Sequence, residues 1–102
     1  MSVNLKTARG IYHLVLAAAA ETVGAAEVIL PLALVRADGV ERVVFRCRIE
    51  GALTSDMTPS SINAAIERVA PSIEREFETV REAALKSIRS EGKLLEIALS
   101  VA

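Results

Sequence analysis

Apolar and polar positions alternate most regularly in the middle of the chain, over residues 27–36 and 40–50. Such alternation is typical of strands that bury one face. Asp38-Gly39 lies between the two runs and tolerates the positive dihedrals of a type I′ turn. With these two residues as the loop, the sequence predicts a β-hairpin with one entirely apolar face. The predicted pairs on this face are Leu34–Val43, Leu32–Phe45, Leu30–Cys47 and Val28–Ile49.

The opposite face of the predicted hairpin is mixed. Its first strand contributes apolar side chains and its second strand mainly arginines, in the order Ile29, Pro31, Ala33 and Val35 against Arg48, Arg46, Val44 and Arg42. A strand that is apolar on both faces is usually covered on both sides or paired along its free edge. Pro31 falls at a hydrogen-bonded position, so a bulge or a one-residue shift is expected there. Near the turn, Arg36 is expected to form an exposed ion pair with Glu41.

Residues 5–22 are predicted as a helix. A helical projection places polar side chains, His13 among them, on one side and apolar side chains, including Tyr12 and Val15, on the other. Because basic residues precede an apolar run and small residues follow it, a secretory signal peptide over residues 1–20 is the alternative.

A second helix is predicted over residues 59–91. Thr58-Pro59 is a typical helix start, with Thr58 as N-cap and Pro59 at the first helical position. From there apolar residues recur at spacings of three and four and continue in phase through Pro71. An unbroken helix would be about 50 Å long, too long for a compact domain with a radius of gyration of about 13 Å. A kink or break is therefore predicted at Pro71; a continuous helix would instead overhang as a dimerisation arm.

Together these elements predict one α+β domain over residues 1–102. A third strand is expected over residues 94–101, where apolar and polar positions alternate again after Gly92. The helices are expected to pack on one face of a small antiparallel sheet. The chain is 52% hydrophobic with three aromatic residues, and so apolar a composition in a small domain favours burial against a partner.

Charge and cysteine content limit the function classes. Twelve basic and thirteen acidic side chains give a formal net charge of -1, so no overall field attracts a polyanion. Cys47 is the one cysteine and has no partner for an internal disulfide, which fits a reducing cytoplasm. The apolar run near the N-terminus is too short to span a membrane. A cytoplasmic location is therefore predicted, with export as the alternative.

Catalytic and metal-binding patterns are missing from the sequence. His13 is the only histidine and is expected on a solvated helix face, while Cys47 is expected to be buried beside Leu30. No residue spacing matches a metal site, and the five glycines form no phosphate-binding loop. The sequence predicts a non-enzyme without cofactor or metal, since an enzyme would need a pocket near His13 or Glu21. Four glutamates of the second helix are expected to form a solvated acidic ridge: Glu67, Glu74, Glu78 and Glu82.

The mixed face of the hairpin is the remaining candidate surface. Its predicted interaction residues are Ile29, Ala33, Val35, Arg42, Arg46 and Arg48. An apolar centre with an arginine rim is typical of a protein interface. Arginine also suits phosphate, so nucleic acid is the alternative partner, although stacking aromatic side chains are missing from this face. The sequence predicts a non-catalytic homo-oligomeric interaction or structural module, with a dimer as the first expectation and another protein as a second type of partner.

Overall fold

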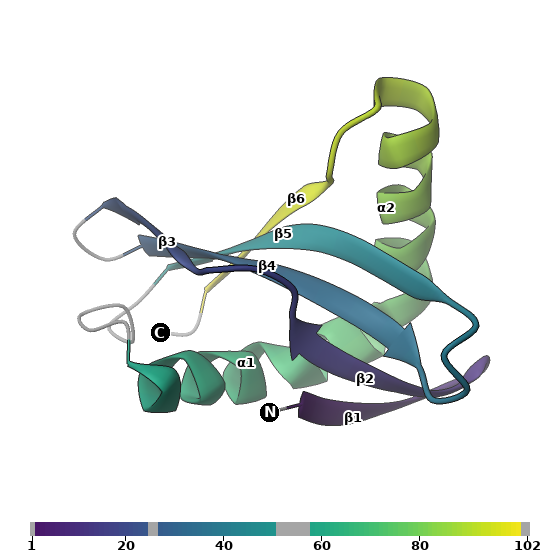
Figure 1. Cartoon of the computed structure of the whole chain (residues 1–102), viewed down its shortest axis with the longest axis horizontal. Coiled ribbons are helices and arrows are strands. Elements are labelled where there is room, and N and C mark those ends of the chain that lie inside the picture. The colour runs from purple at the N-terminus through teal and green to yellow at the C-terminus, as the bar shows by residue number, and fades with distance from the viewer. Residues whose placement is uncertain (1, 25–26, 51–57, 101–102) are drawn as a thin grey trace.

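The computed structural model describes residues 2–24, 27–50 and 58–100. Within this part of the chain, strands come first and two helices follow them (Figure 1). The elements are β1 (Ser2–Thr7), β2 (Gly10–Leu16), β3 (Glu21–Gly24), β4 (Glu27–Arg36), β5 (Arg42–Glu50), α1 (Pro59–Arg75), α2 (Phe77–Glu91) and β6 (Glu96–Ser100).

These strands form one mixed sheet. Its order is β1-β2-β4-β5-β6, and the short β3 also pairs with β4. Neighbouring strands are antiparallel except β5 and β6, which are parallel. The helices connect these two parallel strands, and both pack on one face of the sheet (Figure 1). The predicted α+β class is confirmed. The expected purely antiparallel sheet is wrong, because the connection through the helices returns the chain parallel to β5.

The predicted helix over residues 5–22 is wrong, because this part of the chain contributes strands β1, β2 and β3. Tyr12 and Leu14 are buried in the core, whereas the alternate residues His13 and Val15 are half-buried on the other face. The apolar run is nearly continuous, so it satisfies a helical period as well as an extended one. The pairing of β2 with β4 favours the strand over the helix, because it provides the backbone of β2 with hydrogen-bond partners that are distant in the sequence.

The register predicted for β4 and β5 is confirmed in every pair along the apolar face. The turn differs from the type I′ prediction. The Arg36 N–H donates to the Glu41 carbonyl over 3.0 Å, which leaves four residues in the loop rather than two. Gly39 has a positive φ of 77°, while Asp38 does not. A four-residue loop keeps the same residues opposite each other. Each pair that would be hydrogen-bonded with a two-residue loop becomes a non-hydrogen-bonded pair, and each non-hydrogen-bonded pair becomes hydrogen-bonded.

This exchange resolves the conflict at Pro31. The facing residue, Arg46, directs its N–H toward β6 and donates to the Leu95 carbonyl over 2.7 Å. The Pro31–Arg46 pair therefore needs no N–H from proline. The Pro31 carbonyl accepts from the Ala17 N–H over 2.8 Å, at the gap between β2 and β3. The expected bulge is wrong, because β4 stays in register with β5 through Pro31.

The start of the helical region and the strand after it agree with the sequence. The Thr58 side chain accepts from the Ser61 N–H over 3.2 Å and so caps α1. Gly92 follows α2 with φ of 65°, the left-handed conformation that commonly ends a helix. The expected strand over residues 94–101 is confirmed as the shorter β6.

The break between the helices lies at Glu76 rather than at Pro71, so the predicted position is wrong. Pro71 lies on the exposed side of α1, which continues through it to Arg75 despite the loss of one backbone hydrogen bond. Glu76 has φ of -102° and ψ of 22°, and α2 then turns sharply away from α1 (Figure 1). The molecule measures 35 × 28 × 21 Å, so an unbroken helix of about 50 Å would overhang it.

The hydrophobic core lies between the sheet and the helices. Alternate residues of β1, β2, β4 and β5 face α1 and α2 and are almost fully buried. At the junction of sheet and helices, the rings of Tyr12 and Phe77 lie 4.6 Å apart between centroids, inclined by 56°, an arrangement favoured by aromatic pairs. Within the described ranges, neither helix is long and apolar enough to cross a membrane.

Candidate interaction surface

The helix-free face, which is the face of the sheet opposite α1 and α2, carries the surface predicted from the sequence. One row across β2, β4 and β5 consists of Val15, Ala33 and Val44, and the next row of His13, Val35 and Arg42. Several apolar side chains here stay accessible, since the three valines are half-buried and Ile11 is 40% exposed. We call Ile11, Val15, Val35 and Val44 the open patch.

An ion-pair lattice covers the other end of this face. Arg46 on β5 donates to the Glu21 carboxylate on β3 over 2.9 Å, although β4 lies between these strands. Its Nε also lies 3.7 Å from a carboxylate oxygen of Glu96. Arg48 donates to Glu27 over 2.7 Å and to Glu96 over 3.3 Å. The lattice therefore joins β3, β4, β5 and β6 through two arginines and three glutamates.

The lattice explains why apolar residues are buried on a face without helices. Arg46 must cross β4 to reach Glu21, and its aliphatic stem then lies over the apolar side chains of that strand. Ile29 is 4% exposed, and Pro31 is also buried. The helix-free face thus has a covered half beneath the ion pairs and an accessible half, the open patch.

All six residues predicted as an interaction surface lie on the helix-free face. Ile29 and Ala33 are already buried within the chain. Arg46 and Arg48 are engaged in ion pairs whose long-range partners the sequence did not reveal. The accessible members are Val35 and Arg42, which face each other across β4 and β5. Binding of a partner at this surface stays a prediction.

The two residues considered for nucleophilic catalysis lie on opposite faces of the sheet. His13 is on the helix-free face, where its Nδ1 lies 2.6 Å from the Asn4 Oδ1. Cys47 is in the core, and burial raises the pKa of its thiol to about 12. A thiol with so high a pKa stays protonated and packs as a small apolar group. Among the residues that the structure describes, no group of three His, Cys, Asp or Glu could hold a metal ion.

A polar network that sequence reasoning missed joins β2, the β4–β5 loop and α2. Arg81 donates from Nε and Nη2 to both carboxylate oxygens of Glu41, each over 2.8 Å. The Tyr12 hydroxyl donates to Glu41 Oε1 over 2.6 Å. These bonds, Arg81 first, lower the pKa of Glu41 from 4.5 to about 2. Arg36 faces Glu41 across the turn, as predicted, but its side chain forms its ion pair with Asp38 over 2.7 Å.

The acidic ridge lies partly against the β1–β2 hairpin instead of facing solvent along its whole length. Glu74 accepts a hydrogen bond from the Lys6 backbone N–H over 2.8 Å. Glu78 forms an ion pair with Arg9 over 2.9 Å. Helical periodicity could predict that these glutamates share one side of the helices. It could not predict that the β1–β2 hairpin packs against that side.

Comparison of the chain with protein-family models, with curated proteins and with solved structures finds no match. Its function is therefore inferred from its own surfaces.

Proposed function

We propose that the protein is a non-catalytic, homo-oligomeric interaction module whose copies meet through the helix-free face. The open patch is the observation that supports this most directly. Both helices pack on the opposite face, while Val15, Val35 and Val44 remain half-exposed on three adjacent strands. Burying such a patch against a second copy removes apolar surface from water, which drives most protein association.

The charge pattern of this face also supports self-association. Arg46 and Arg48 are paired with glutamates of the same chain, so they add little repulsion between two copies, whereas the exposed Arg42 would lie at the border of the contact. The apolar open patch then forms the centre of the contact, and the ion-pair lattice lies beside it as a polar rim. A two-fold dimer needs one self-complementary surface of this kind.

Nucleic acid remains the alternative partner, but no feature of the described surface favours it specifically. A phosphate would have to compete with Glu21 for Arg46 and with Glu27 for Arg48. Three arginines on one face would give weak and strongly salt-dependent binding even without this competition.

Val44→Glu is expected to weaken self-association at least about 100-fold, because the glutamate would have to lose its hydration in the centre of the apolar contact. Val44 is half-buried and lies in the same row as Val15 and Ala33. Size-exclusion chromatography with light scattering, run over a range of micromolar concentrations, measures the effect as a shift from dimer to monomer.

Val40→Glu is the matched control. Val40 is 77% exposed in the loop beyond β4, so the same chemical change lies outside the open patch. This variant should keep the wild-type mass. Circular dichroism of both variants checks that the sheet is intact, and Val35→Arg repeats the test at a second position. Association that survives both patch substitutions in folded protein would rule out this interface.

A further inference from the structure

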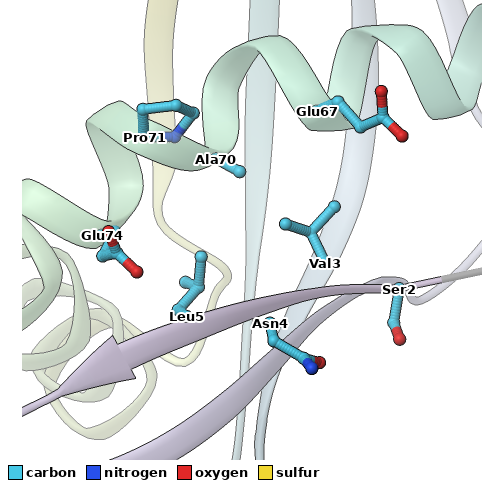
Figure 2. A pocket seen from close by; sticks show the side chains of 8 residues that line it. All are labelled: Ser2, Val3, Asn4, Leu5, Glu67, Ala70, Pro71 and Glu74. Carbon is cyan, nitrogen blue, oxygen red and sulfur yellow. The ribbon is translucent and has the colours of Figure 1, made fainter.

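A groove runs between the edge strand β1 and helix α1, away from the helix-free face. It encloses about 660 Å³, a size typical of ligand-binding clefts. Residues 2–5 of β1 form one wall, and α1 forms the other (Figure 2). Val3 and Leu5 point from the strand toward the helix, where Ala70 and Pro71 lie opposite (Figure 2). The accessible apolar side chains of the groove are Val3 and Pro71, because Leu5 and Ala70 are almost fully buried.

The strand wall of the groove is a free sheet edge. β1 is the terminal strand in the sheet order, and within the described part of the chain it pairs with β2 alone. The Ile11 carbonyl, opposite Lys6, accepts from the N–H of Ala37, the residue after β4, over 2.8 Å. Lys6 and Ile11 therefore form a non-hydrogen-bonded pair within the hairpin. The backbone groups of Lys6 therefore point outward from the sheet. Since this orientation repeats every second residue, those of Asn4 and Ser2 point outward too.

The contact between Lys6 and Glu74 shows what this edge can bind. The outward Lys6 N–H donates to a Glu74 carboxylate oxygen over 2.8 Å, so a side chain of α1 already occupies the first edge position. The edge positions at Ser2 and Asn4 lie beyond Glu74, along the groove. An unpaired strand edge is a template for pairing with another chain.

The dimensions of the groove fit a short strand. The strand wall extends about 10 Å from Ser2 to Leu5 at about 3.4 Å per residue. The α1 wall extends about 10 Å from Glu67 to Glu74 at 1.5 Å per residue. An extended peptide of about four residues would fill this length.

The charges that line the groove are acidic. Glu67 and Glu74 lie on the α1 wall, and no basic residue lies among the described side chains that line this groove. Both glutamates are exposed, and none of the ion pairs among the described residues involves Glu67. A second copy of β1 would bring the same two carboxylates of its own α1 toward these, which is unfavourable. A strand with basic side chains would instead be attracted.

We propose that the β1–α1 groove binds an extended, lysine- or arginine-containing segment of another protein by adding it as a strand beside β1. The Ser2 and Asn4 backbone groups supply the ladder hydrogen bonds, as in other cases of strand addition. Side chains of the segment alternate between the two faces. On the α1 side, an apolar residue packs on Val3 and Pro71, and a basic residue pairs with Glu67. This proposal uses a surface other than the open patch, so either can fail without the other.

The test uses blocked heptapeptides in which lysine or arginine alternates with valine or threonine. Titration into the ¹⁵N-labelled full chain, followed by NMR, is expected to shift the amide signals of residues 2–6 and of the groove side of α1 most strongly. Glu67→Lys is expected to weaken the best peptide at least about tenfold, because it reverses the charge opposite the basic side chain. Peptides with glutamate in place of the basic residues should bind at least about tenfold more weakly.

Two peptide analogues test the backbone contribution. Backbone N–H groups of an extended peptide point alternately to its two edges. One analogue carries N-methyl groups at all positions whose N–H points to one edge, and the other analogue carries them at the positions whose N–H points to the other edge. Strand addition uses one edge only, so one analogue should lose at least about tenfold in affinity and the other should retain most of it. Glu91→Lys, at the far end of α2, makes the same charge change away from the groove and should leave the affinity within about twofold.

Four results would overturn the proposal. The first is that none of the basic peptides binds at about millimolar concentration, and the second is that folded Glu67→Lys keeps the wild-type affinity. The third is that both N-methylated analogues bind equally well. The fourth is that the signal shifts are confined to residues outside β1 and α1.

Discussion

Glu41→Gln is expected to lower the free energy of unfolding by about 2 kcal/mol at pH 7, because it removes the two-pronged carboxylate partner of Arg81 and leaves only the exposed Glu82, which accepts from Arg81 over 2.8 Å. The Arg81 side chain is 11% exposed, and both carboxylate oxygens of Glu41 accept from it. The Tyr12 hydroxyl also keeps only a weaker, neutral acceptor. Urea denaturation of wild type and variant, monitored by circular dichroism, measures the difference.

The matched control is Asp38→Asn in the same loop. Asp38 pairs with Arg36, but the Asp38 side chain is 51% exposed. Exposed ion pairs contribute little, so this variant should unfold at nearly the wild-type urea concentration. Equal losses in the two variants would mean that the network around Glu41 has no special role.

The effect of Glu41→Gln should also depend on pH. The folded-state pKa of Glu41 is about 2, below its ordinary value of 4.5. A carboxyl with a lowered pKa contributes stability that is complete above the unfolded value and is lost as pH falls through the folded value. The difference between wild type and variant should therefore stay constant from pH 7 to about 5 and shrink between about 4.5 and 2. A difference that stays constant down to pH 2 would contradict this assignment.

Leu14→Ala is expected to cost about 3 kcal/mol, and Val15→Ala less than about 1 kcal/mol, because the two residues face opposite sides of β2. Leu14 is fully buried in the core, opposite Leu34, whereas Val15 is half-buried on the helix-free face. Denaturation of the two single variants at low protein concentration, where self-association contributes little, gives both values.

This pair of variants distinguishes a strand from the helix predicted over residues 5–22. The helical projection places Val15 among the apolar side chains facing the core, so a helix would make Val15→Ala costly. A larger loss for Val15→Ala than for Leu14→Ala would therefore contradict the strand assignment of β2. Val40→Ala, in an exposed loop position, gives the baseline for removing an exposed apolar side chain.

The parts of the fold that could be predicted are those fixed by local pattern. The β4–β5 register follows from strict alternation around Asp38-Gly39, and the start of α1 follows from the Thr58 cap. The parts that could not be predicted depend on distant pairing. Residues 10–16 satisfy either period, and their pairing with β4 decides between them. The helix break lies at Glu76, where neither proline nor glycine indicates it, while Pro71 lies inside α1 and is a misleading signal.

The residues of the candidate surface could be predicted from the sequence, but the ion-pair partners of its arginines could not. Alternation placed Arg46 and Arg48 on one face with Ile29 and Val35. Sequence spacing could not show that the arginines meet glutamates from β3, β4 and β6, because those strands lie far apart in the chain. The same long-range packing creates the β1–α1 groove, since β1 and α1 become neighbours only in the folded chain.

Contacts between methyl groups of two copies test the proposed self-association most directly. An NMR sample that mixes ¹³C-labelled and unlabelled chains records nuclear Overhauser effects between copies only. The open patch predicts such signals among the methyl groups of Val15, Val35 and Val44, and their loss in Val44→Glu. A wild-type sample at about millimolar concentration that shows no signals between copies, or shows them only at residues of α2, would contradict the proposed interface.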